Sequence, residues 1–404
     1  MTDLSPCVQY ARALVQCPSV TPAEAGALSF LQGELERLGF ACERLVFRDE
    51  DIPDVDNLFA RIGTKAPHLC FAGHTDVVPV GDEAAWTHPP FSAEIVDGVV
   101  YGRGTADMKG SVACFLAAAE RVVKARDTGA LPGSISFLIT GDEEAIAING
   151  TVKVLQWMAD NGHTPDHCLV GEPTCPQKVG EEIKIGRRGS LTADLEISGK
   201  QGHVAYQHFA CNPVPAMAAA LAALTGAPLD NGTNHFPPSN LEVTTVDVGN
   251  AADNIIPARV TATFNTRFND LHTHDTLAEI VRRRVEEAIA PFMTDDKLSA
   301  KLTFRYSNAD AFMTEPGPLI DAMAAAISKH TGLTPKLSTA GGTSDARFIK
   351  NFCPVFEFGP LNQTIHQVDE RVPIADLELV TDIYTSFIEN YFATFSSAET
   401  SAAA

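Results

Sequence analysis

Three apolar stretches of this chain lead directly into histidine or acidic residues, which limits the folds that it can adopt. Residues 69–72 lead into His74 and Asp76, residues 134–140 lead into Glu143 and Glu144, and residues 167–170 lead into Glu172. Short apolar runs of this kind are typical of buried strands, and an open α/β sheet binds its ligands beyond the carboxyl ends of such strands. Imidazole and carboxylate groups are ligands that suit zinc and related ions. The pattern therefore predicts a metallohydrolase with its metal site at one edge of a sheet.

The segments around these strands favour an α/β domain. Residues 5–40 have the pattern of amphipathic helix with a break near 18–22, and residues near 57–62 are expected to add a strand. Helices are predicted from about Asp107 and from about Gly150 to Met158. Strands that alternate with helices indicate a mostly parallel, mixed sheet that is covered on both faces.

The hydrophobic pattern changes after Arg187. Residues 190–198 alternate with a period of two, as strands with one buried face do, and a helix, two more alternating strands and another helix follow. This order predicts a smaller α+β domain with an antiparallel sheet, inserted as residues 188–302 into a discontinuous larger domain of residues 1–187 and 303–404. The last residues, 396–404, are small and polar and are expected to be disordered.

Composition limits the classes of binding partner and the cellular compartment that we expect for this protein. The net charge is −21, which opposes binding to nucleic acid or to an anionic membrane. The N-terminus lacks the basic and apolar regions of a secretory signal, and no apolar stretch reaches the ~18 residues of a membrane span. The nine cysteines form no CxxC pair and are expected to be reduced thiols. We therefore expect a cytoplasmic protein.

Each candidate ligand also has a simpler explanation when it is taken alone. A histidine at a strand end, such as His74, is commonly an ordinary hydrogen-bonded loop residue, and Asp107 could be only a helix N-cap. The pair Glu143 and Glu144 could be a solvated helix cap, and Glu172 could be an acid in a turn. Taken together they are more specific, because several strand ends converge on one side of one sheet.

The combination of motifs resembles the co-catalytic di-zinc peptidase and deacylase family, which includes aminoacylase, acetylornithine deacetylase and carboxypeptidase G relatives. The resemblance covers nearly the whole chain and rests on residues 73–79, 101–110, 140–144 and 170–174. It implies that Asp107 bridges two zinc ions, one also held by His74 and Glu172 and the other by Glu144 and His366. Cobalt or manganese could replace zinc, since both accept nitrogen and oxygen ligands.

The resemblance also assigns catalytic roles. Asp76 would orient the imidazole of His74, and Glu143 would be the general base that takes a proton from water and passes it to the leaving amine. In this family a histidine at the position of His203 reaches the active site of the second subunit of a homodimer and stabilises the oxyanion. Without the resemblance, His203 would be an ordinary surface or core histidine. The inserted domain would then be the dimerisation domain.

A second set of motifs points to one branch of the family. Residues 184–191, 201–206, 341–348 and 364–366 resemble the branch that hydrolyses N-succinyl-L,L-2,6-diaminopimelate to succinate and L,L-2,6-diaminopimelate, in lysine biosynthesis. This resemblance gives Arg187, and by analogy Arg267, to the substrate carboxylates, because guanidinium binds carboxylate through two hydrogen bonds. Without the resemblance, Arg187 and Arg188 would be explained as two solvated surface charges. Weaker candidates, each equally explained by a structural role, are Tyr206, Asn254, Gly342, Thr343 and Asn362.

Two positions depart from the family pattern without removing a ligand. Ala145 and Ile146 stand where relatives often carry Gly-Pro, and Gln207 stands where they often carry proline. Because proline fixes φ, these changes are expected to reshape the loops beside Glu143 and His203. Another deacylase or a dipeptidase on the same scaffold remains an alternative function, as does an inactive metal-binding homologue.

Overall fold

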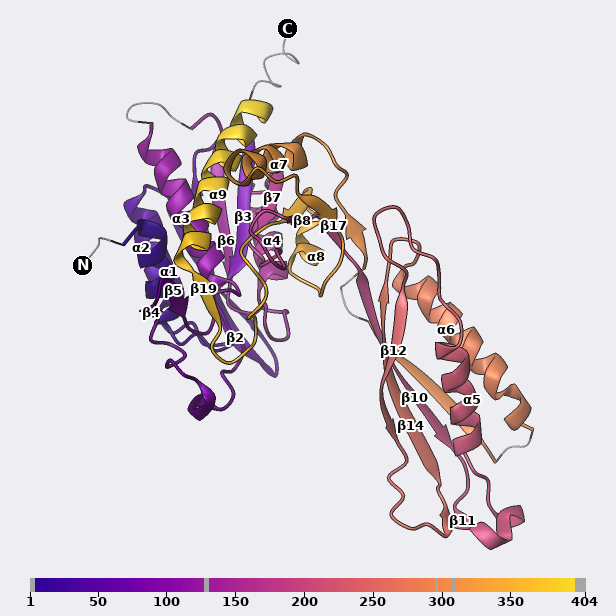
Figure 1. The fold of residues 1–404 in the computed structure, drawn as a ribbon. Coiled ribbons are helices and arrows are strands. Elements are labelled where there is room, and N and C mark those ends of the chain that lie inside the picture. The colour runs from indigo at the N-terminus through magenta and orange to yellow at the C-terminus, as the bar shows by residue number, and fades with distance from the viewer. Residues whose placement is uncertain (1–3, 127–130, 295–296, 307–309, 397–404) are drawn as a thin grey trace. The chain divides into compact units, whose positions relative to one another are not determined.

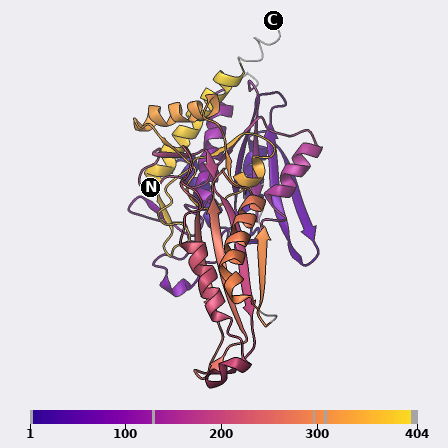
Figure 2. The same cartoon turned by 90° about the vertical axis from the view of Figure 1, so that its right-hand side faces the viewer.

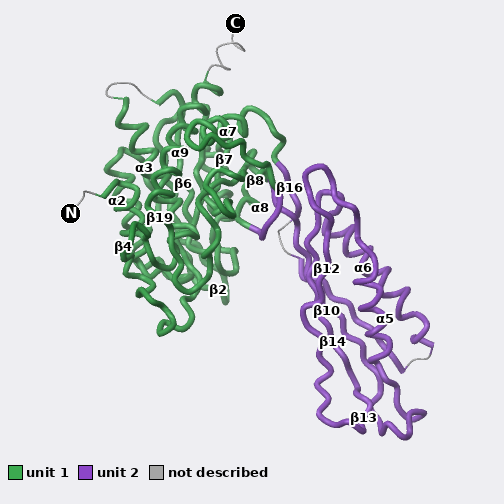
Figure 3. Tube along the Cα trace, in the orientation of Figure 1, with its two compact units in different colours: residues 1–185, 314–338, 344–404 green, residues 186–313, 339–343 purple. Residues whose placement is uncertain are grey.

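The computed structural model of the chain describes residues 4–126, 131–294, 297–306 and 310–396 (Figure 1). The terminal segment that the sequence predicts to be disordered lies almost wholly outside these ranges. The chain divides into two compact units (Figure 3). The first unit contains residues 1–185, 314–338 and 344–404, and the second contains residues 186–313 and 339–343.

The first unit is built on an eight-stranded mixed sheet. Its strands, in spatial order, are β1 (Ala41–Asp49), β2 (Ile52–Ile62), β6 (Ser134–Thr140), β3 (His68–His74), β7 (His167–Val170), β18 (Val355–Glu357), β8 (Glu182–Lys184) and β17 (Lys336–Ser338). Strands β6, β3, β7 and β18 run parallel, whereas β2 pairs antiparallel with β6. The parallel strands therefore end at one edge of the sheet, and the predicted α/β fold class is confirmed.

Helices in this unit gather in two groups (Figures 1 and 2). The elements are α1 (Pro6–Val15), α2 (Ala27–Arg37), α3 (Lys109–Lys124), α4 (Thr151–Asp160), α7 (Pro318–Thr331), α8 (Ala346–Ile349), α9 (Ile374–Phe395) and the 3-10 turn η1 (Glu83–Ala85). Helix α9 packs against α3 and α7, and α1 packs on α3, while α4 contacts α8 and β6. All seven residues of both β3 and β6 are buried, so both faces of the central strands are covered.

Aromatic side chains fix the core between α3, α9 and the sheet. The rings of Phe71 and Phe115 stack with centroids 4.3 Å apart, Tyr384 meets both edge-on, and Phe137 meets Phe115 edge-on. The buried hydroxyl of Tyr384 lies 2.8 Å from that of Ser111 on α3, so the phenol does not remain unsatisfied in the core. This packing anchors the start of α3, which follows Asp107.

A small three-stranded sheet positions the segment that carries His366. Its strands are β19 (Arg371–Pro373), β5 (Val99–Tyr101) and β4 (Glu94–Val96), and β19 pairs antiparallel with β5. The pairing of Arg371 with Tyr101 brings the residues just before β19 beside those just after β5. Segments more than two hundred residues apart in sequence therefore meet at this point.

The second unit is a four-stranded antiparallel sheet with two helices. The sheet has the order β12 (Asn240–Asp247), β14 (Arg259–Phe268), β10 (Gly189–Ser198) and β15 (Ser299–Tyr306), and its helices are α5 (Val214–Thr225) and α6 (His274–Ile289). Strand β10 alternates strictly between buried and half-buried residues, as its period of two predicts. Its buried residues Ala193, Leu195 and Ile197 join buried residues of α5 and α6 in one apolar core.

Shorter elements complete this unit. They are the strand pairs β9 (Gly186–Arg187) with β16 (Phe312–Met313) and β11 (Gly202–His203) with β13 (Ile255–Ile256), and the 3-10 turns η2 (Val204–Phe209) and η3 (Ala290–Phe292). From the sequence we expected the chain to return to the larger domain near residue 303. It rejoins the first unit at Thr314, because β15 pairs with β10 as a fourth strand. Among the described residues, no helix has the length and apolar character needed to cross a bilayer.

Candidate metal centre

The candidate centre is formed where the parallel strands of the first unit end. His74 is the last residue of β3, and its side chain is 1% exposed. Its Nε2 lies 3.2 Å from Oδ1 of Asp107 and 4.0 Å from Oε1 of Glu172. One ligand atom from each of these three residues lies within 4.8 Å of the others, a spacing that suits a single metal ion.

Asp107 faces a second set of side chains with its other oxygen. Oδ2 lies 3.5 Å from Nε2 of His366, and the same imidazole nitrogen lies 2.9 Å from Oε1 of Glu144. Asp107, Glu144 and His366 form a further group whose ligand atoms lie within 4.8 Å of one another. The two oxygens of one carboxylate thus point to two different nitrogen and oxygen clusters, as a bridging ligand requires.

Electrostatics in this cluster favour cations. Burial opposes ionisation of Asp107, but hydrogen bonds with His366 and His74 outweigh it and hold the pKa of Asp107 well below its usual range. Hydrogen bonds to Asp107 and Glu144 raise the pKa of His366 to about 10. Because these carboxylates stabilise positive charge placed between them, the donor set fits divalent metal ions.

Close backbone packing places Glu172. Its strand, β7, ends at Val170, and the residue lies beside Gly359 from the loop after β18. A Cβ atom at position 359 would lie 2.5 Å from the carbonyl oxygen of Glu172, so only glycine permits this approach. Burial, reinforced by the carboxylate of Asp107, raises the pKa of Glu172.

Asp76 acts differently from the expectation. We predicted that its carboxylate would accept the hydrogen bond from the far nitrogen of His74. Instead Nδ1 of His74 lies 2.9 Å from the main-chain oxygen of Asp76, and the nearest carboxylate oxygen is 3.7 Å away. The carboxylate accepts from the backbone N–H groups of Glu143 (3.3 Å) and Glu144 (3.0 Å), so Asp76 orients the histidine through its backbone and both glutamates through its side chain.

Glu143 lies beside the centre without belonging to either set that includes Asp107. It forms its own group with His74 and Glu144, with one atom of each within 4.8 Å. Burial, aided by the neighbouring carboxylates of Asp345 and Glu144, raises the pKa of Glu143 to about 8. A carboxyl group whose pKa lies near neutrality can both accept and release a proton in a reaction.

The loop after Glu144 is closed by Asp142. Its Oδ2 accepts from the backbone N–H groups of Ile148 and Asn149, each at 2.9 Å. Ala145 and Ile146, which depart from the family pattern, are exposed within this loop. The loop therefore closes through hydrogen bonds of the Asp142 side chain, two residues beyond the exposed Ala145 and Ile146.

Several predicted substrate residues gather in the second unit. Arg187, on β9, is 8% exposed and donates from Nη1 to the carbonyl of Gly342 at 3.1 Å. Arg267, on β14, is half-buried and pairs across the sheet with Ser190 and Asn240. Thr343 follows Gly342 in the same short segment of this unit.

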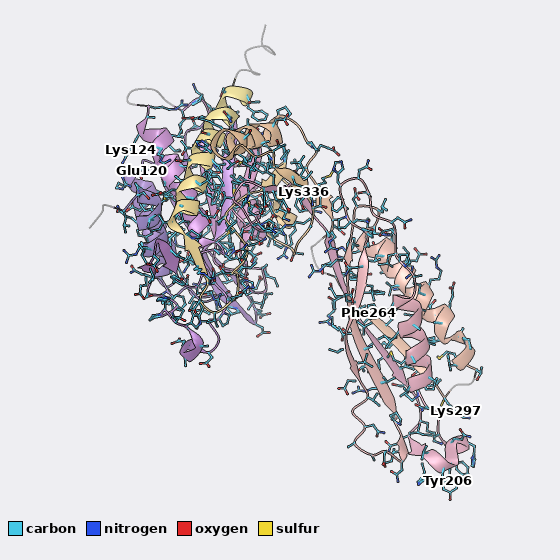
Figure 4. The ribbon with its side chains drawn as sticks, in the orientation of Figure 1. Glu120, Lys124, Tyr206, Phe264, Lys297 and Lys336 are labelled. Atoms are coloured by element: carbon cyan, nitrogen blue, oxygen red, sulfur yellow. The ribbon has the colours of Figure 1, made fainter. Side chains whose placement is uncertain are left out.

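A second group surrounds His203 in the same unit. His203 is exposed on β11, its ring centroid lies 5.5 Å from that of Tyr206, and its neighbour Val204 donates its N–H to the carbonyl of Asn254. Tyr206 lies on η2 with 57% of its surface exposed (Figure 4). Asn362 belongs instead to the first unit, where its N–H bonds the carbonyl of Cys175.

One pair near the centre was missed by sequence reasoning. Glu370 and Arg103 form a buried ion pair of 2.7 Å, and Glu370 also accepts from the backbone N–H of Asp107 at 3.1 Å. Arg103 lies inside a motif that we had singled out, and Glu370 comes four residues after His366. Their spacing in sequence gives no sign that they touch.

The chain is similar to known proteins over most of its length. The model of the peptidase family M20/M25/M40 matches residues 70–390. The chain belongs to this family. Members of its size include a succinyl-diaminopimelate desuccinylase of Rhodopseudomonas palustris (strain BisB18), which is 54% identical over 95% of this chain and 97% of that protein. A protein of the same name from Methylorubrum extorquens is 54% identical over 97% of this chain and its own full length. The family recognised from the sequence motifs is confirmed.

Solved structures of the family share the fold. An M20 metallo-carboxypeptidase from Sulfolobus solfataricus matches with a TM-score of 0.75 at 16% identity, covering 96% of this chain and all of that one. The Bacillus subtilis YXEP protein, described as a dinuclear metal binding peptidase, matches with a TM-score of 0.70 at 16% identity, covering 96% and 98% of the two chains.

Proposed function

We propose that this chain is a metal-dependent amide hydrolase that converts N-succinyl-L,L-2,6-diaminopimelate and water to succinate and L,L-2,6-diaminopimelate, in lysine and diaminopimelate biosynthesis. The observation that carries the proposal is the arrangement of Asp107 between His74 and His366, in a chain that is 54% identical to proteins named for this reaction. We propose two zinc ions, one held by His74, Asp107 and Glu172 and the other by Asp107, Glu144 and His366.

In this proposal Glu143 performs the proton transfers. When bound, the metal ions would polarise the scissile carbonyl and make water more acidic. Glu143 accepts the proton of the attacking water and then delivers it to the leaving amine, a role suited to its raised pKa. Asp76 holds the backbone of both glutamates, so that one remains available for proton transfer while its neighbour serves as a ligand.

The substrate is recognised through its carboxylates. The chain carries a net charge of −21, so an anionic substrate needs local cations. Arg187 and Arg267 supply them in the second unit, and Gly342 accepts a hydrogen bond from Arg187 that fixes its guanidinium. Tyr206, Asn254, Thr343 and Asn362 are proposed as further contacts.

We also propose that the protein is a cytoplasmic homodimer. Its second unit would form the interface, and His203 would be supplied to the centre of the other subunit to stabilise the oxyanion. The exposed position of His203 supports this assignment, since the side chain is accessible to another molecule. Neither nucleic acid nor a membrane is part of the proposal.

A substrate panel with metal analysis tests the function. The same preparation is assayed on succinyl-diaminopimelate, acetylornithine and a dipeptide, and its metals are counted by elemental analysis. We expect hydrolysis of the succinylated substrate to be fastest, two zinc ions per chain, loss of activity on chelation and recovery with zinc, cobalt or manganese. Full activity without bound transition metal, or preference for acetylornithine, would contradict the proposal.

A further inference from the structure

A buried carboxylate supports the backbone that presents Asp107. Oε1 of Glu370 accepts three backbone N–H groups at once, from Gly104 (3.1 Å), Ala106 (2.9 Å) and Asp107 (3.1 Å). These donors belong to the loop between β5 and α3. Because a side-chain atom satisfies them, the loop needs no regular secondary structure to hold its shape.

Arg103 neutralises this carboxylate. Its Nη1 donates to Oε2 of Glu370 at 2.7 Å, and the two side chains are 3% and 0% exposed. The guanidinium carbon lies 5.2 Å from the ring centroid of Trp86, and Nη1 also reaches the carbonyl of Gln367 at 3.2 Å. A buried charge is tolerated only when it is paired and hydrogen-bonded, and each member of this pair is.

The same pair reaches the turn that carries His366. Gln367, whose carbonyl Arg103 binds, follows His366 directly, and the carbonyl of Glu370 accepts the N–H of Gly102 at 2.8 Å. Thr364 closes the turn by hydrogen bonds with both the N–H and the carbonyl of Arg371. His366 itself has a φ of +60°, a conformation that surrounding contacts must hold.

We propose that Glu370, together with Arg103, is a positioning residue of the candidate metal centre. Its carboxylate joins the Asp107 loop to the His366 turn, and so sets the distance between the bridging carboxylate and one histidine ligand. The proposal rests on the proposed two-metal centre. It assigns Glu370 no contact with substrate or metal, because its oxygens are occupied by Arg103 and the backbone.

The matched substitution is Glu370→Gln. It preserves size, but its amide must turn an NH2 group either toward Arg103 or toward the three backbone donors, so one side of the arrangement is lost. The ion held by Glu144 and His366 should weaken most, because both the Asp107 loop and the His366 turn depend on Glu370. Substitutions behind metal ligands typically weaken metal affinity about 10- to 100-fold.

The test is a titration of the metal-free full chain with Co2+, followed by absorbance and by calorimetry. Wild type should bind two ions in steps, and Glu370→Gln should lose about 10- to 100-fold in affinity at one step and less at the other. Glu120→Gln is the matched control. Glu120, labelled in Figure 4, is also buried and paired, with Tyr10, Arg37 and Lys124, but it lies in the last two turns of α3, whereas the Asp107 loop precedes the start of this helix. The Glu120→Gln variant should bind Co2+ in two steps with the affinities of wild type.

The outcomes separate the two proposals. If wild type binds fewer than two ions, the two-metal centre is wrong, and the role of Glu370 falls with it. If wild type binds two ions and Glu370→Gln binds both with the affinities of wild type, only the positioning role is overturned, even if the variant has a lower melting temperature. Should Glu370→Gln fail to fold by circular dichroism, Glu370→Asp is titrated instead. It keeps the charge but shortens the reach to the loop, and it must show the same selective loss.

Discussion

Two adjacent glutamates at the end of β6 have separate surroundings. Glu144 lies 2.9 Å from the imidazole of His366, whereas Glu143 groups with His74 and has a pKa of about 8. Their backbone N–H groups share one acceptor, the carboxylate of Asp76. The proposed division between a ligand, Glu144, and a base, Glu143, thus depends on the direction in which each side chain leaves a common backbone support.

Replacing Glu143 by glutamine tests this division. The amide is nearly isosteric but cannot accept a proton from water, so kcat should fall by at least ~10²-fold. Metal content by elemental analysis should remain that of wild type. Glu144→Gln should instead lose one metal ion, and the reverse pattern in the two variants would exchange their roles.

Arg187→Ala tests substrate selection. Loss of a desolvated guanidinium–carboxylate pair typically costs about 2–4 kcal/mol, so kcat/KM on the succinylated substrate should fall accordingly. An N-acetyl substrate has no distal carboxylate and should be affected much less. Equal losses on both substrates would mean that Arg187 serves the structure, through its hydrogen bond to Gly342, or a carboxylate common to both.

For individual residues, the sequence identified the candidate metal ligands but not all of their hydrogen-bond partners. The motifs led to His74, Asp107, Glu144, Glu172 and His366, and the structure brings these five side chains together. The sequence could not distinguish the carbonyl of Asp76 from its carboxylate as the partner of His74, because both lie within reach of an extended backbone. Glu370 was missed since its partners are more than 260 residues away.

Strands were predictable where one or both faces are buried. The period of two in residues 190–198 and the apolar runs of β3 and β6 follow from burial, and each forms the expected strand. Strand β15 (Ser299–Tyr306) was missed although Ala300, Leu302, Phe304 and Tyr306 alternate with polar residues, and although Leu302 and Phe304 pack against the core of the second unit. Pairing with β10, a tertiary interaction, makes it a strand.

A buried histidine on β3, next to β6, should make the free energy of unfolding depend on pH. His68 opens β3, its Nε2 lies 2.7 Å from the hydroxyl of Ser136 on β6, and burial, with Arg61 nearby, lowers its pKa to about 4. In the unfolded chain this imidazole takes up a proton near pH 6.5, before it can do so in the fold. The contribution of neutral His68 to the free energy of unfolding is therefore fully present above about pH 6.5 and is lost as the pH falls to about 4.

Urea unfolding of His68→Gln measures this contribution. Wild type should lose about 3 kcal/mol to this group between pH 7.5 and pH 4, from a pKa difference of this size. The glutamine variant should show a smaller decrease over the same range, although it starts from a lower stability at pH 7.5. An identical pH dependence in the two proteins would show that folding does not lower the pKa of His68.

At the scale of the whole molecule, the division into two units could be predicted from the change in hydrophobic pattern. Its limits could not, because short pairs such as β9 with β16 and the segment 339–343 have no pattern of their own. The hydrophobic pattern does not predict the oligomeric state either. An exposed His203 is compatible with any partner, and only the family resemblance proposes a second copy of the chain.

Mixed dimers test that assembly. A His203→Ala chain and a Glu143→Gln chain should each be nearly inactive. After subunit exchange, hybrids should recover part of the activity, because one of their two centres would combine an intact Glu143 with an intact His203 from the other chain. Hybrids verified by two affinity tags that recover no activity would show that His203 does not act between subunits.

The placement of the second unit within the sequence has a consequence for synthesis on the ribosome. Four of the candidate ligands, from His74 to Glu172, emerge before that unit, while β17, β18, His366 and α9 emerge after its main segment, residues 186–313. Because domains fold as units during translation, the second unit can complete its sheet while the first still lacks β17, β18, β19 and the 22-residue helix α9. A nascent chain therefore displays an unfinished candidate centre for much of its elongation, and His366, the last candidate ligand, is available only when translation is nearly complete.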